Sequence, residues 1–87
     1  MQAEGPEQMK IAVLSHSDVA GYYAATLMER GHKVTISGGG ALNPNALKPY
    51  LECDACLLLG EELDLLHIAD AMEAAGKKVW RDLAKIP

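Results

Sequence analysis

The fold is decided by the stretch KIAVLSHSDVAGYYAATLMERGHKVTIS, residues 10–37, in which two apolar runs flank a segment of helical period. After Lys10 the run to residue 14 is continuously apolar, as in a strand that helices cover on both faces. Residues 32–37 form a short run rich in β-branched side chains, which predicts a second strand. The segment between them predicts a helix that ends at Gly31, with an apolar stripe of Val19, Tyr23 and Leu27 flanked by Ala20, Ala24 and Met28.

The second half of the chain continues the alternation of strand and helix. Residues 53–60 are another apolar strand, and residues 77–81 predict a fourth. Between them Glu61, Glu62 and Asp64 place negative charge in the first turn of a helix, which closes at Gly76. Its predicted buried stripe is Leu65, Ile68, Ala69 and Met72. A shorter helix is predicted to begin at Asn43-Pro44 and to be disturbed near Pro49.

Strands that alternate with helices over short connections predict an α/β fold with a parallel sheet, because crossovers between parallel strands are right-handed. We expect four strands in the order 2-1-3-4, with helices on both faces. The polar residues 1–8, which include Gly5-Pro6, predict a flexible tail, and residues 9–87 a single domain.

Composition excludes several classes of partner. The formal net charge of −4 offers no basic field for nucleic acid or an anionic membrane. No apolar run approaches the ~20 residues of a membrane span, and the first nine residues do not form a secretion signal. Cys53 and Cys56 suit a reducing compartment, so we expect a cytoplasmic protein. A domain of this size buries little surface, which makes a homodimer plausible.

The first half resembles the opening βαβ unit of NAD(P)-binding Rossmann enzymes, in particular the F420-dependent NADP reductase type. The resemblance rests on residues 11–20 (IAVLSHSDVA) and 30–35 (RGHKVT). Ser15, Ser17 and Ala20 occupy the three positions of the glycine fingerprint. The resemblance implies a Rossmann-like or flavodoxin-like fold and NAD(P) as the candidate cofactor. No Asp or Glu stands at the end of the second strand, where such enzymes hold the ribose.

The second half looks like the end of nucleoside 2-deoxyribosyltransferase-like proteins. There a strand such as residues 53–60 (CDACLLLG) is followed by a helix and by a strand such as residues 76–79 (GKKV). The resemblance implies a nucleoside-handling activity. The family's catalytic glutamate corresponds to a place near His67-Ile68, where this sequence has no carboxylate.

Ligands of open parallel sheets bind beyond the carboxyl ends of the strands at the switch point, here between the first and third strands. The residues predicted to bind a ligand there are Ser15, His16, Ser17, Ser37, Gly38 and Gly60. The hydroxyl and N–H groups of residues 15–17 suit an anion, but Asp18 competes for the same N–H groups and Glu61-Glu62 repels a phosphate. Simple helix capping by these residues is the alternative interpretation.

The candidate catalytic residues are His16, Glu61 and Glu62. An imidazole at a helix N-terminus is biased toward its neutral form, which can act as a base or a hydrogen-bond donor. The CxxC spacing of residues 53–56 enters a strand instead of a helix, so we interpret it as two structural thiols. Asp64, His67 and Asp70 lie opposite the predicted buried stripe and are interpreted as a solvated helix face, so no metal site is predicted.

Three functional hypotheses follow from the sequence. The first is a small module that binds a nucleotide or nucleoside without catalytic machinery. The second is a non-catalytic interaction or regulatory protein that uses the fold as a scaffold. The third is a hydrolase or transferase of the deoxyribosyltransferase-like class, with Glu61 or Glu62 in place of the missing glutamate.

Overall fold

A computed structural model of the chain describes residues 8–37 and 47–86. Its sheet has four strands, all parallel, in the order β2-β1-β3-β4. Their bounds are Lys10–Leu14 for β1, Lys33–Ser37 for β2, Ala55–Leu58 for β3 and Lys78–Trp80 for β4. The predicted α/β class and strand order are therefore confirmed.

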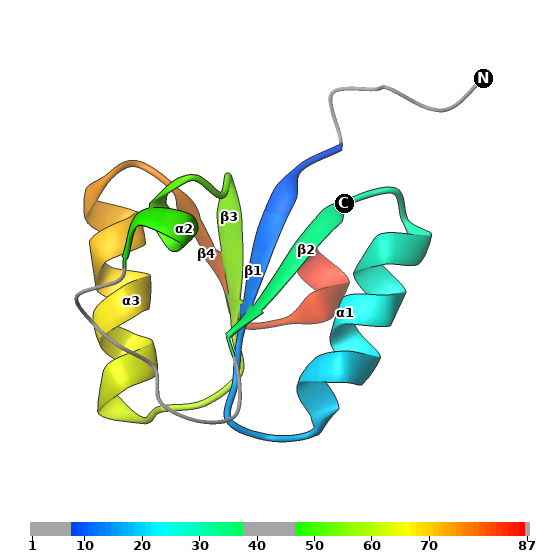
Figure 1. Ribbon diagram of the computed structural model, residues 1–87, viewed down its shortest axis with the longest axis horizontal. Coiled ribbons are helices and arrows are strands. Elements are labelled where there is room, and N and C mark those ends of the chain that lie inside the picture. The colour runs from blue at the N-terminus through cyan, green and yellow to red at the C-terminus, as the bar shows by residue number, and fades with distance from the viewer. Residues whose placement is uncertain (1–7, 38–46, 87) are drawn as a thin grey trace.

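The helices form a layer on each face of the sheet (Figure 1). One layer holds α1 (Val19–Glu29) and a short 3₁₀ helix, η1 (Leu83–Lys85), which packs on the α1 side of the sheet. The other layer holds α2 (Lys48–Leu51) and α3 (Leu63–Ala74). No helix in the described part of the chain is long and apolar enough to cross a membrane.

The central strand β1 contributes to both halves of the core. Ile11 and Val13 pack into the cluster on the α1 side, whereas Ala12 and Leu14 pack into the cluster on the α3 side. All four side chains are fully buried. Because successive side chains of a strand point to opposite faces, a strand covered on both sides requires apolar residues at every position.

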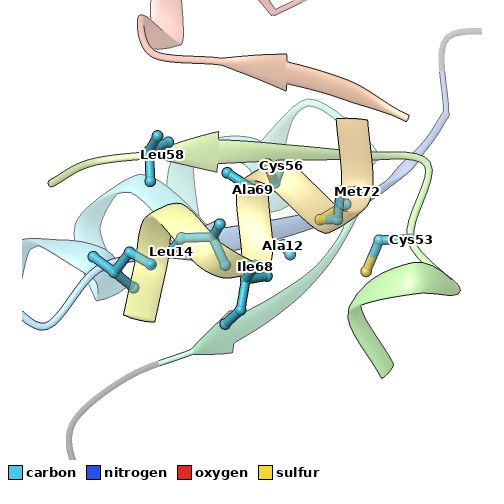
Figure 2. Packing of buried hydrophobic residues seen from close by; sticks show 9 residues of the cluster. Ala12, Leu14, Cys53, Cys56, Leu58, Ile68, Ala69 and Met72 are labelled. Atoms are coloured by element: carbon cyan, nitrogen blue, oxygen red, sulfur yellow. The ribbon is translucent and has the colours of Figure 1, made fainter. Parts of the chain in front are cut away.

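The helix α3 lies over the sheet with the predicted stripe facing inward. Leu65, Ile68, Ala69 and Met72 are all buried, as predicted, and they pack against Leu58 of β3 and its neighbours (Figure 2). The stripe is apolar at every third or fourth position, which matches the 3.6-residue period of the helix.

The stripe of α1 differs in part from the prediction. Ala20, Ala24 and Leu27 are buried, but Val19 is 47% exposed and Met28 is 54% exposed. The buried face is centred on the two alanines, whose small side chains allow the helix to approach the sheet closely. Positions 19 and 28 fall on opposite flanks of that face. The helix ends as predicted, at Gly31, whose φ of +95° suits glycine.

The short helix α2 begins at Lys48. Pro49 lies in its first turn, where a missing N–H costs nothing. The predicted start at Asn43-Pro44 lies outside the described residues.

The segment after β4 belongs to the core, although the sequence pattern did not assign it. Ile86 is only 3% exposed and packs into the cluster on the α1 side. Arg30, at the end of α1, donates hydrogen bonds from Nη1 to the carbonyl oxygens of Ile86 at 3.0 Å and Leu83 at 3.5 Å. This guanidinium fastens the segment to α1.

Candidate functional site

The candidate site lies at the carboxyl edge of the sheet, where β1 and β3 end side by side. Leu14 of β1 is in register with Leu58 of β3. β1 is followed by α1 on one face of the sheet, and β3 is followed by α3 on the other face. The chain therefore leaves these two strands toward different layers, which makes this the switch point of the sheet. Both α1 and α3 begin at this edge.

A hydrogen bond between two side chains joins the loops that follow these strands. His16 Nε2 lies 2.8 Å from Asp64 Oδ2, and both side chains are about one-third exposed, at 28% and 31%. The other carboxylate oxygen of Asp64 accepts a hydrogen bond from the Leu65 N–H at 2.8 Å. Asp64 is thus held through both oxygens and fixes the orientation of the imidazole.

This contact determines what His16 can do chemically. Because a carboxylate only accepts, the proton of a neutral imidazole is assigned to Nε2, which donates to Asp64. Nδ1 is then left with a lone pair that can accept a hydrogen bond or a proton. A histidine oriented by a carboxylate is a recurrent arrangement for binding a hydroxyl group and for general base chemistry.

The interpretation of Asp64 as part of a solvated helix face was wrong. His67 and Asp70 are exposed on α3 as expected, but Asp64 turns toward His16. A residue in the first turn of a helix lies at the sheet edge where the preceding strand ended, so it can meet the neighbouring loop. The signal in the sequence was the place of Asp64 in that first turn.

The serines of the first loop mainly organise the loop itself. Ser15 is 1% exposed, and its Oγ accepts a hydrogen bond from the Ser17 N–H at 2.9 Å. Ser17 Oγ accepts one from the Val19 N–H at 3.3 Å. Asp18 makes no capping hydrogen bond with its side chain, so the expectation that it competes for these N–H groups was wrong. The serine hydroxyls accept from the Ser17 and Val19 N–H groups instead, within the loop and at its junction with α1, and the N-cap position of the helix itself has no side-chain cap.

The second loop brings two carboxylates to the same edge. Glu61 and Glu62 are exposed, and Glu62 immediately precedes α3. A Cβ on Gly60 would overlap Glu62 Oε1, so the Glu62 carboxylate folds back over this glycine. Because that carboxylate ends a flexible, exposed side chain, it can move aside, so this contact does not by itself require glycine at position 60.

Two of the predicted ligand-binding residues fall at the limit of what the structure describes. Ser37 ends β2 opposite Leu14 in the strand register. The side chain of Ser37 and the whole of Gly38 lie outside the described residues.

The edge is negative. Asp18, Glu61, Glu62 and Asp64 all lie in or beside the two loops, and His16 is the one basic side chain among residues 15–18 and 59–64. Carboxylates at this density repel an incoming anion, and part of that repulsion persists at physiological salt. The arrangement favours a neutral ligand over a phosphate.

The two cysteines are free and buried at a different place, on the α3 side of the sheet. Cys53 lies beside α2 and Cys56 beneath α3 (Figure 2). Burial raises the pKa of the Cys56 thiol to about 12 and also raises the pKa of Cys53, although Lys10 opposes the latter shift. Thiols that stay protonated are poor nucleophiles and poor metal ligands, which fits the structural interpretation.

Within residues 8–37 and 47–86, no three His, Cys, Asp or Glu side chains gather closely enough to hold a metal ion. The same residues enclose no pocket, so the His16–Asp64 pair lies on an open surface in the described part of the chain. Comparisons of the chain with protein-family models, with curated proteins and with solved structures found no match.

Proposed function

We propose that this domain binds a nucleoside at the carboxyl edge of β1 and β3, with His16 as the central contact. The observation that carries the proposal is the 2.8 Å hydrogen bond between His16 Nε2 and Asp64 Oδ2, which bridges the two loops of the switch point. It presents Nδ1 as an oriented acceptor for a ribose or deoxyribose hydroxyl. Val19, 47% exposed, and Leu63, 84% exposed, begin α1 and α3 at this edge and offer apolar surface for a base.

The proposal specifies a nucleoside in preference to its phosphate because of how the loop amides are used. The N–H groups of Ser17 and Val19 donate to serine hydroxyls, so an entering phosphate has to displace them. It also meets Glu61, Glu62 and Asp64 at the same edge. A neutral sugar hydroxyl that binds to His16 neither displaces the serine hydroxyls from these N–H groups nor is repelled by the carboxylates.

The second candidate function is a non-catalytic scaffold that binds another protein. The observation in its favour is that the described residues form no pocket, whereas small-molecule sites are usually concave. A nucleoside titration separates the two candidates because a scaffold has no reason to respond to it.

The test is a solution NMR titration with adenosine, deoxyadenosine and AMP. We expect amide shifts confined to residues 15–18 and 60–64, with the two nucleosides binding more tightly than AMP. His16→Ala is expected to weaken adenosine binding at least about tenfold, the cost of one hydrogen bond to an oriented group. His67→Ala, on the exposed face of α3, serves as the matched control and should bind as the wild type does. An unchanged spectrum at millimolar nucleoside would rule out the proposal.

Replacing both Glu61 and Glu62 by glutamine should change the ranking of these ligands. We expect AMP to bind about two- to fivefold more tightly at low salt, with a smaller gain at high salt, because two exposed repulsive charges are removed. Adenosine binding should stay within twofold, since adenosine carries no charge. If the deoxyribosyltransferase-like hypothesis holds instead, the wild type cleaves deoxyadenosine and the double variant loses that activity. Product analysis by chromatography checks this outcome directly.

A further inference from the structure

Within residues 8–37 and 47–86, the outer edge of β2 presents hydrogen-bonding groups that no other strand pairs with. β2 is an edge strand of the described sheet, and the Lys33 N–H donates to the Met9 carbonyl on the β1 side at 2.9 Å. Successive residues of a strand direct their N–H and C=O groups to opposite sides. Those of Val34 and Ile36 therefore point away from β1, toward the open edge.

The two edges of the sheet differ in how well they resist pairing with another strand. β4, at the far edge, has three residues, begins with Lys78 and is followed by Arg81. Short strands and charged residues are the usual protection of an edge. β2 has five residues, of which Lys33 alone is charged, so it is the edge open to pairing.

The flank of α1 beside this edge is apolar and small. Arg30 turns toward η1 on one side of the helix, and the right-handed crossover from β1 to β2 places β2 on the other side. On the β2 side of the helix, Gly21 and Met28 lie about a quarter-turn from the buried stripe and Ala25 lies somewhat farther round, and all three are exposed. Ile36 is 46% exposed on the same face of the sheet as Val13 and therefore as α1.

We propose that two copies of this chain associate by antiparallel pairing of their β2 edges, around a two-fold axis at Thr35. Val34 of one copy then lies opposite the partner's Ile36, and the two exchange both backbone hydrogen bonds. Thr35 faces its own copy across the axis. The pairing joins two four-stranded sheets into one of eight.

The same axis makes the two α1 helices complementary. Both helices span the length of β2 and run antiparallel across the axis, so Met28 of one copy meets the partner's Gly21. No heavy atom lies within 4 Å of the place where a Cβ on Gly21 would be, so there is room for the methionine side chain. Ala25 packs on its own copy and lets the helices approach closely.

Charge favours this contact because a two-fold axis places each residue near its own copy. A charged residue near the axis would repel its copy, as like charges do across a strand pair. Lys33 is the one charged residue of the paired strand, and the register places it opposite the partner's Ser37 instead of opposite its own copy. The contact residues nearest the axis are uncharged, although 23% of the chain is charged. They are Gly21, Ala25, Met28, Val34, Thr35 and Ile36.

The contact is small, which sets the expected affinity. One helix and one strand, each about 16 Å long, bury roughly 600–800 Å² in total, less than the ~1,200 Å² of a stable complex. We therefore expect a dimer with a dissociation constant on the order of 100 µM.

Sedimentation equilibrium from about 10 µM to about 1 mM tests the proposal across that expected range. The weight-average mass of the wild type should rise from the 9.3 kDa of one chain toward twice that value. Ile36→Lys and Ala25→Glu, each at an exposed position, should raise the dissociation constant at least about tenfold. The matched control is Tyr22→Lys, which changes a 70% exposed residue on the outward face of α1 and should leave association intact.

A second measurement does not depend on variants. Hydrogen exchange of the Val34 and Ile36 amides should slow as the concentration of the wild type rises, whereas exchange in β4 should not change. A wild type that stays at 9.3 kDa at 1 mM overturns the proposal. So does a dimer that Tyr22→Lys abolishes and Ile36→Lys preserves, because that dimer uses another surface.

Discussion

Leu58→Ala is expected to lower the free energy of unfolding by about 2–4 kcal/mol. Leu58 is 3% exposed in β3 and packs between the sheet and α3 (Figure 2). The truncation loses the transfer free energy of the side chain and leaves a cavity that a short strand, fixed by neighbours on both sides, closes poorly. Chemical denaturation monitored by circular dichroism measures the loss.

Leu63→Ala is the control for that measurement. Leu63 has the same side chain but is 84% exposed at the first position of α3, so its truncation should change stability by less than about 0.5 kcal/mol. Equal effects at the two positions would contradict the placement of β3 in the core.

Alkaline pH is expected to destabilise the domain through Cys56. Burial raises the pKa of this thiol from 9.0 to about 12 in the folded chain, so the folded state keeps a proton that the unfolded state releases. The stabilisation is complete below pH 9 and is lost as pH rises from 9 toward 12. For this group alone the loss is on the order of 1 kcal/mol at pH 10.

Unfolding free energies of the wild type and Cys56→Ala, each measured from pH 7 to pH 10, check this prediction. The variant starts from a different stability, so the slope with pH is the quantity compared. The slope should be shallower in the variant, but not zero, because burial also raises the pKa of Cys53 and Tyr50. Parallel slopes for the two proteins would contradict the assignment to Cys56.

The sequence predicts the strands and the buried face of α3 better than it predicts the buried face of α1. Each strand appears as an apolar or β-branched run, and these runs together with short connections suffice for the order of the sheet. The face of α1 was harder because almost every residue from Val19 to Met28 is small or apolar. Because α1 has no clearly polar face, the periodicity does not determine which side of the helix packs on the sheet. In the structure the side with Ala20 and Ala24 packs there.

For the candidate site, the sequence predicts the location but not the contacts between side chains. The sequence places His16 and the start of α3 at one edge, because parallel strands end together. It does not reveal that Asp64 reaches His16, since that depends on the position of each loop to within a hydrogen-bond length. Nor does it reveal that Ser15 turns inward and occupies an amide that an anion needs. A contact between two side chains that are 48 residues apart produces no periodic pattern in the sequence from which it could be predicted.

The buried position of Ile86 has a consequence for how the protein forms on the ribosome. Arg30 and the α1 side of the core are complete only when residues 83–86 have arrived, some fifty residues after Arg30 was synthesised. The nascent β1–α1–β2 unit must therefore keep part of its apolar face uncovered while the remaining chain is translated. Its core closes late, at the end of synthesis of this segment, and the uncovered stage is when a nascent-chain chaperone has the most surface to bind.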